Sequence, residues 1–181
     1  MPNWAIGSVN VTGTKAAVKA FADRFIYGEE PKTPENKRFF ARSFHEYSRA
    51  EVNTSIEDAF EGAEAEEIGE VGFPVSFAWS AYSCLLDGYP QRAAECIELG
   101  DACIEDGVSV CIETSEPGIC FEEFITCSTD GDICVEEREM KSYKCRHCGE
   151  VENIASYDDP ETYECCRCGK EGFDLISKKE V

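Results

Sequence analysis

The sequence predicts an α+β fold, in which helices cover one face of a mainly antiparallel, ferredoxin-like sheet and a small cysteine-rich module follows. Over the first hundred residues, strand patterns and helical patterns alternate. Short strand patterns separated by turn residues come next, and two C-x₂-C pairs lie near the end. A length of 181 residues with 43% hydrophobic content suits one ordinary core and a small appendage.

The first half begins with a strand and an amphipathic helix. Residues 4–11 are rich in β-branched and aromatic side chains, which favour a strand. Apolar residues then recur at helical spacing over 15–27, behind Thr14 as a plausible N-cap. Residues 28–50 contain prolines and mixed charges, so we expect a loop with one short helix near 38–47.

An acidic helical insertion is predicted over about residues 28–70. Thr54 and Glu57 have the spacing of a capping box, which places a short helix at 54–64. After it, residues 75–80 alternate apolar and polar side chains, as a strand does.

The second half completes the sheet. Pro90 suits the first turn of a third helix, whose apolar face continues to about Glu105. Three antiparallel strands are then predicted, at 108–113, 119–128 and 132–139. We therefore expect one domain over residues 1–140 and a separate module over residues 141–181.

The strongest motif is the pair of C-x₂-C knuckles, each followed by glycine. Their cysteines are Cys145, Cys148, Cys165 and Cys168. Four thiolates at this spacing can converge on one Zn²⁺, and the glycines let the backbone turn beneath the metal. The sequence thus predicts a zinc ribbon whose closed, four-thiolate site is structural.

Other ligand sets compete with this one. His147 could replace a cysteine of the first knuckle, and Cys166 competes with Cys165 in the second. The regular two-residue gap favours the four-cysteine set. Four cysteines can also hold iron, in an iron–sulfur site, instead of zinc. Seven cysteines upstream of residue 140 are interpreted as free and mostly buried thiols. They are Cys84, Cys96, Cys103, Cys111, Cys120, Cys127 and Cys134.

The net charge of −20 is concentrated in the middle of the chain. Residues 51–140 carry 23 Asp and Glu against two Arg, and residues 51–91 contain no Lys or Arg. Such a field repels phosphate and disfavours nucleic acid as the partner of this region. A charge run is often only a solvated face. It can also present carboxylates to a partner protein whose surface normally binds the phosphates of nucleic acid.

No catalytic apparatus is recognisable, and we expect the protein not to be an enzyme. The two histidines, His45 and His147, lack the context of a general base, and no phosphate loop or nucleophile elbow is present. Paired acids such as Glu122-Glu123 are predicted on strands, where one member of each pair should face water.

Several landmarks resemble the YubB/Api92-like ferredoxin-fold family of bacteriophages, plasmids and their hosts. The resemblance covers about residues 1–140 and rests on Met1-Pro2-Asn3-Trp4, Val9-Asn10-Val11-Thr12-Gly13, Phe77-Ala78-Trp79-Ser80, Glu116-Pro117-Gly118 with Phe121, and Asp130-Gly131. It implies a ferredoxin-like fold and a mobile-element setting, and it carries over no catalytic residue.

These observations lead to one functional expectation. The protein would bind and inhibit a nucleic-acid-handling host defence protein, such as a Cas nuclease, through an acidic surface that mimics nucleic acid. The partner-binding residues predicted for this anti-CRISPR-like role are Glu57, Asp58, Glu61, Glu64, Glu66 and Glu67.

The alternative is a zinc-ribbon protein that binds nucleic acid directly or serves as an adaptor. Its module offers Lys and Arg side chains, including Arg146 and Arg167, beside Tyr143 and Tyr163. The opening residues lack the apolar stretch of a signal peptide, and no run reaches the roughly 18 to 20 apolar residues of a membrane span. We therefore expect the cytoplasm of a bacterial host cell and no membrane partner.

Overall fold

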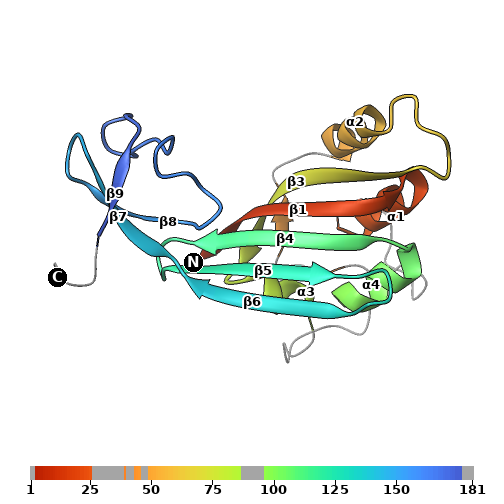
Figure 1. Ribbon diagram of the computed structural model, residues 1–181. Coiled ribbons are helices and arrows are strands. Elements are labelled where there is room, and N and C mark those ends of the chain that lie inside the picture. The colour runs from red at the N-terminus through yellow and green to blue at the C-terminus, as the bar shows by residue number, and fades with distance from the viewer. Residues whose placement is uncertain (1–2, 26–38, 40–42, 46–48, 87–95, 177–181) are drawn as a thin grey trace.

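The computed structural model describes residues 3–25, 39, 43–45, 49–86 and 96–176, and shows a mixed α+β protein with a small C-terminal sheet (Figure 1). Its elements, in chain order, are β1 Trp4–Thr14, α1 Lys15–Phe25, β2 Ser43–His45, α2 Arg49–Ala59, β3 Ile68–Ala78, α3 Ala81–Leu85, α4 Leu99–Asp106, β4 Ser109–Glu116, β5 Phe121–Cys127, β6 Ile133–Glu139, β7 Lys141–Cys145, β8 Val151–Ile154 and β9 Phe173–Leu175.

The main sheet has six strands in the order β2-β3-β1-β4-β5-β6, and every neighbouring pair is antiparallel. Strand β1 lies between β3 and β4. Its register with β3 runs from Trp4 opposite Ala78 to Thr14 opposite Ile68. This pairing fixes which side chains of β1 and β3 share a face.

The core lies between one face of the sheet and the helices. Along β1, Ala5, Val9 and Val11 are buried, whereas Ile6 on the other face is 51% exposed. The buried side chains join helix residues such as Phe21 and Phe25 in one hydrophobic cluster. Helices therefore cover one face of the sheet, as the sequence predicts, and the other face is open except where the C-terminal module covers it.

Helix α2 begins earlier than the capping box predicts. Thr54 and Ser55 lie inside the helix, where their hydroxyls donate to the carbonyls of Ala50 and Glu51, one turn back. A Ser or Thr hydroxyl can cap a helix by accepting from a backbone N–H, or can lie inside a helix by donating to the carbonyl four residues earlier. Thr54 and Ser55 do the second, so the motif misplaced the helix start. The helix also ends at Ala59 instead of residue 64, and its buried residues are Val52 and Ile56.

The predicted insertion takes part in the main sheet and its core. Strand β2 lies within it and pairs with the end of β3, although a helix was expected near residues 38–47. The rest of that short helix lies outside the described residues. Strand β3 starts at Ile68 instead of residue 75, because it pairs with β1 along its full length.

The third helix is only partly comparable with its prediction, since residues 87–95, including Pro90, lie outside the described residues. Helix α4 spans Leu99–Asp106 and is followed by Gly107, which has the left-handed φ of 69° typical of a helix C-terminus. Its buried residues are Leu99, Ala102 and Cys103, whereas Ile104, predicted for the apolar face, is 55% exposed.

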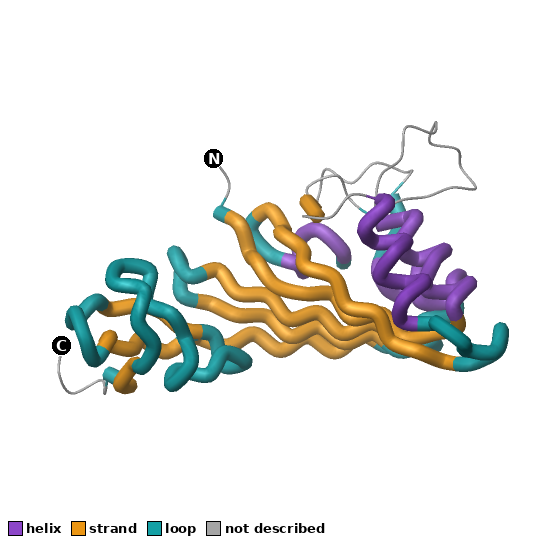
Figure 2. Tube along the Cα trace, turned by 90° about the horizontal axis from the view of Figure 1, so that it is seen from above, coloured by secondary structure: helices purple, strands orange, loops and turns teal. Residues whose placement is uncertain are grey.

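The C-terminal module forms a second sheet in the order β8-β7-β9. Strand β7 follows β6 after one residue, and the module lies at the end of the main sheet that is distant from α1 and α2 (Figures 1 and 2). Within the described residues, no helix is long and apolar enough to cross a membrane.

Candidate metal centre

The first knuckle is formed where β7 ends. Cys145 is the last residue of β7, and its backbone N–H donates to the Glu150 carbonyl at 2.8 Å. Gly149 donates to the Cys145 carbonyl at 3.0 Å and has a φ of 76°, which a residue with a side chain rarely adopts. The tight turn leaves both sulfurs of the pair on its inner side.

The second knuckle repeats this geometry. Cys165 donates to the Lys170 carbonyl at 3.0 Å, and Gly169, with a φ of 64°, donates to the Cys165 carbonyl at 2.8 Å. Equal spacing in the sequence has therefore produced two equivalent turns that face one another.

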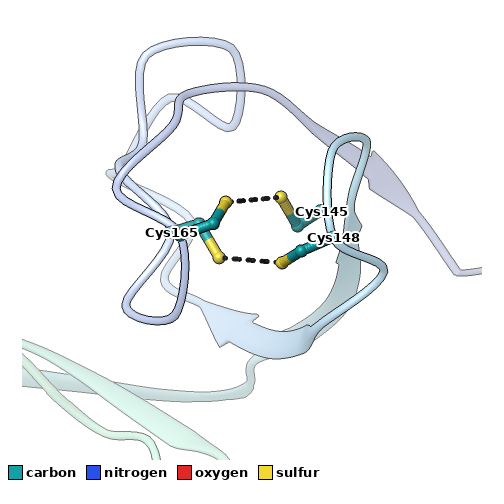
Figure 3. A group of neighbouring side chains, drawn as sticks. Cys145, Cys148 and Cys165 are labelled. Carbon is teal, nitrogen blue, oxygen red and sulfur yellow. Dashed lines mark hydrogen bonds between the residues drawn. The ribbon is translucent and has the colours of Figure 1, made fainter.

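The four sulfur atoms, those of Cys145, Cys148, Cys165 and Cys168, lie within 4.8 Å of one another. The sulfur of Cys145 is 3.8 Å from that of Cys168, and the sulfur of Cys148 is 3.6 Å from that of Cys165 (Figure 3). Four thiolates about 2.3 Å from a central ion at tetrahedral angles would have sulfurs about 3.8 Å apart. These distances exceed the roughly 2.05 Å of a disulfide, and all four cysteines are free. The site therefore fits one tetrahedral metal ion.

The competing ligands lie outside this cluster. His147 and Cys166 are both exposed, and neither is part of the group of side chains that could hold an ion. Cys166 follows Cys165 directly, yet its backbone N–H donates to Glu152 at 3.2 Å while its sulfur stays outside. Throughout the described part of the chain, no other His, Cys, Asp and Glu group has metal-binding geometry.

Backbone N–H groups favour the thiolate form of one ligand. Donors from Cys148 and His147 lower the pKa of the Cys145 thiol to about 7, against the opposing effect of burial. A lowered thiol pKa makes metal binding at neutral pH easier, because the ligand must lose its proton.

The module has its own small core around these ligands. Cys145, Cys165, Ile154 and Phe173 are buried together, and the ring of Tyr163 packs edge-on against Phe173 at 5.7 Å. So small a core suits a fold that depends on its metal.

Two arginines of the module are held by internal carboxylates. The guanidinium of Arg146 forms a two-bond contact with Glu161, at 2.6 and 2.7 Å, and its Nε donates to Asp174 at 2.7 Å. Arg167 donates to Glu150 at 2.8 Å. These arginines are the ones that direct nucleic-acid binding would use, so their phosphate-binding groups already have anionic partners.

The module also docks onto the open face of the main sheet. The Ser156 N–H donates to the Glu122 carboxylate at 2.7 Å, and the Asn153 side chain donates to the Pro117 carbonyl at 3.1 Å. The ring of Tyr157 packs edge-on against Phe124, with centroids 6.3 Å apart. Neither Ser156 nor Tyr157 has a spacing that the sequence could have revealed.

The Glu122-Glu123 pair corrects a prediction, because both side chains are buried. Glu122 lies beneath the module, and Glu123 accepts from the N–H of Ala81 at 2.7 Å and from Thr114 at 3.3 Å. Burial raises the pKa of Glu123, although the backbone donors oppose the rise. Glu123 therefore provides a hydrogen-bond acceptor for the backbone N–H of Ala81, the first residue of α3.

A cavity of about 220 Å³ lies where the module meets β6. Side chains of both charges line it, among them Glu122, Arg138, Lys141 and Asp158. Burial and the charge of Glu122 raise the pKa of Asp158. Arg138 is already engaged, since it lies over the Phe124 ring at 4.7 Å and pairs with Glu136.

The six acids predicted to bind a partner lie at the end of α2 and on the loop to β3. All are exposed: Glu57, Asp58, Glu61, Glu64, Glu66 and Glu67. Glu57 forms an ion pair with Lys15 of α1, which lowers the pKa of its carboxyl. The Glu64 N–H donates to the Glu67 carboxylate at 3.3 Å. The six acids thus lie on one segment of the chain, and the charge of one of them, Glu57, is paired with that of Lys15.

Comparisons of this chain with protein-family models, curated proteins and solved structures found no match.

Proposed function

We propose that the protein is a metal-stapled binding protein whose acidic segment, residues 57–67, docks against a cationic surface on another protein. The observation that carries this proposal is the unequal use of charge. The arginines of the metal module are held by internal carboxylates, whereas five of the six predicted acids have no basic partner among the ion pairs of the described residues.

The partner that fits such a segment is a protein that handles nucleic acid. Such proteins grip phosphates through Lys and Arg channels, and a carboxylate-rich surface can occupy the same channel. The most concrete version is inhibition of a host defence enzyme such as a Cas nuclease, in the cytoplasm of a bacterial cell. The mobile-element setting of this version comes from the resemblance alone.

We infer that the metal is Zn²⁺ and that its role is structural. Four thiolates and no open ligand position are typical of structural zinc. Iron suits the same ligands, so the metal content of the purified protein decides between them. About one zinc per chain supports the inference, and iron with visible charge-transfer absorption contradicts it.

We also infer a ferredoxin-like core. The strand order β2-β3-β1-β4, with α1 after β1 and α4 before β4, supports a βαββαβ unit extended by β5 and β6. A crystal structure tests this inference through the handedness of the two crossovers.

The test of the proposed function is a charge reversal with a matched control. We expect Asp58→Lys, Glu61→Lys and Glu64→Lys together to weaken partner capture and to reduce its sensitivity to salt. The control changes Asp130, Glu164 and Glu171 to Lys, which alters the net charge equally but at exposed sites elsewhere. Capture and cleavage assays against Cas nucleases and other DNA-binding host enzymes provide the readout. Equal weakening by both triple variants would contradict a role for this particular segment.

Direct nucleic-acid binding is the alternative to exclude. A gel shift with metal-loaded protein at low salt tests it, with Arg146 and Arg167 substituted in turn. A complex that depends on these arginines would favour the alternative over the acidic-segment proposal.

A further inference from the structure

The cavity between the metal module and β6 contains charges of both signs that do not pair with one another. Glu122, Lys141 and Asp158 all line this space of about 220 Å³. Among the described residues, none of these three side chains takes part in an ion pair. Two carboxylates and one ammonium group therefore share a small space without neutralising one another.

Glu122 is the buried anion of this cavity. It is 2% exposed, and within the described part of the chain its carboxylate accepts one hydrogen bond, from the Ser156 N–H to Oε2 at 2.7 Å. Arg138 lies directly opposite Glu122 in the pairing of β5 with β6. The guanidinium of Arg138 nevertheless pairs with Glu136 and lies over the Phe124 ring. A buried carboxylate with no cationic partner is costly, so this position favours a positively charged visitor.

Asp158 provides a second carboxylate within electrostatic reach of the first. Asp158 is half-buried, and burial together with the negative charge of Glu122 raises the pKa of its carboxyl. Its backbone N–H donates to the Ala155 carbonyl at 3.1 Å and closes a turn, whose Tyr157 is bonded to Ser115 on β4. This wall of the cavity is therefore held in place before any ligand arrives, as in most ligand sites.

The rest of the lining offers a cation and an apolar surface. Lys141 begins β7, and the lining also includes Tyr143, Ile154 and Pro160. The volume of about 220 Å³ is well above the roughly 30 Å³ that one water occupies. It is below the roughly 300 to 1,000 Å³ of sites for drug-sized ligands. The cavity therefore suits a small ligand that has an anionic group, a cationic group and an apolar part.

We propose that this cavity binds a small zwitterion of the α-amino-acid class that has an apolar side chain. Its ammonium group binds the carboxylates of Glu122 and Asp158, and its carboxylate binds Lys141. Charge-assisted contacts of this kind are among the stronger hydrogen bonds in proteins. The metal module lies at the end of the main sheet distant from α2, so this site is separate from the acidic segment and does not depend on the proposed function (Figure 1).

Calorimetric titration and thermal unfolding of the full, metal-loaded chain test the proposal. The probes are L-alanine, L-valine and L-methionine. Isobutylamine and isovalerate each keep only one of the two charges of valine and serve as ligand controls. We expect at least one of the amino acids to bind with a Kd below about 1 mM and to raise the thermal midpoint. Each ligand control should bind at least about tenfold more weakly than valine, because one charge-assisted contact is lost.

The deciding variants are Lys141→Met and Glu122→Gln. Each removes one charge from the cavity and should weaken amino-acid binding about tenfold or more. A glutamine can still accept from the Ser156 N–H, so the docking of the module is retained in the second variant. Lys19→Met is the matched control, because it removes a lysine charge at an exposed site on α1. It should bind the amino acid like the parent.

The possible outcomes separate the cavity from the acidic segment. Absence of binding by all three amino acids overturns the proposal, and so does equal affinity for valine and either ligand control. Parent-like binding by Lys141→Met, or equal weakening by Lys19→Met, overturns it as well. If Glu122→Gln does not fold, Lys141→Met still decides, since Lys141 is exposed. The triple charge reversal of the acidic segment leaves the cavity intact and should bind the amino acid normally, whether or not it captures a protein partner.

Discussion

The hydroxyl of Tyr157 in the metal module donates a hydrogen bond of 2.9 Å to the hydroxyl oxygen of Ser115 on β4. The two residues are 42 positions apart, and their contact ties the loop after β8 to the open face of the main sheet. Together with the Ser156–Glu122 bond, it makes the metal module a docked unit instead of a freely tethered one.

Removal of Tyr157's hydroxyl should loosen this docking. We expect Tyr157→Phe to cost about 1 kcal/mol, the usual net value of a neutral hydrogen bond, since the ring can still pack on Phe124. Denaturant unfolding of Tyr157→Phe, Ser115→Ala and the double variant forms a cycle that isolates the pair. Additive single effects would show that this bond contributes nothing to docking.

Chelation of the metal should unfold residues 141–181 and leave the sheet of residues 1–140 largely intact. The module buries few apolar side chains of its own, whereas the main sheet has a continuous core. Circular dichroism with limited proteolysis after chelation tests this, and added Zn²⁺ should reverse the change. Collapse of the whole chain would mean that the docked module is integral to a single core.

Loss of the hydrogen bonds made by the Arg146 guanidinium should speed metal release. Arg146→Lys removes the paired bonds to Glu161 and the bond to Asp174, which join the first knuckle to the segments before and after the second knuckle. An ammonium cannot reproduce this planar geometry. Arg167→Lys is the comparison, because it affects only the single ion pair between the second knuckle and Glu150 of the first. We expect faster transfer of metal to a coloured chelator only for Arg146→Lys; equal rates would contradict the bridging role.

Phe25 should be among the most sensitive core positions. Its ring is 1% exposed and packs against Phe39, Phe73 and Phe77 at centroid distances of 5.5 to 6.1 Å. Phe25→Ala should lower the unfolding free energy by about 3–5 kcal/mol. Ile68→Ala, at a site that is 70% exposed, should change it by less than about 0.5 kcal/mol. Similar losses for both variants would place the core elsewhere.

Glu123 should give stability a pH dependence of unusual sign. Burial raises its pKa above the ordinary 4.5, so the folded protein holds this proton to higher pH than the unfolded chain does. Its contribution to stability is therefore largest below pH 4.5 and falls as pH rises through the folded pKa. Denaturant unfolding at several pH values, for the parent and Glu123→Gln, should show this fall in the parent only. A parallel pH dependence in both would assign the effect to other groups.

Local sequence patterns predicted those helices and strands in which apolar residues recur at regular spacing. Helix α1 occupies Lys15–Phe25 within the predicted 15–27, and Thr14 accepts a hydrogen bond from the Ala17 N–H at 3.3 Å, as an N-cap does. Strand boundaries that depend on pairing with a distant strand could not be predicted from local patterns. The start of β3 at Ile68 depends on β1, which lies more than fifty residues away in sequence.

The sequence by itself determined the metal site, because equal spacing and a glycine after each cysteine pair dictate two equivalent turns whatever surrounds them. Tertiary structure alone decided what the charged residues do. Arg146 looks available for phosphate in the sequence, but folding brings Glu161 and Asp174 to it. One member of the Glu122-Glu123 pair is expected to face water, but the docked module buries Glu122 while Glu123 lies in the core. Backbone turns are local, whereas the partner of a charge is set by which distant segments the fold brings together.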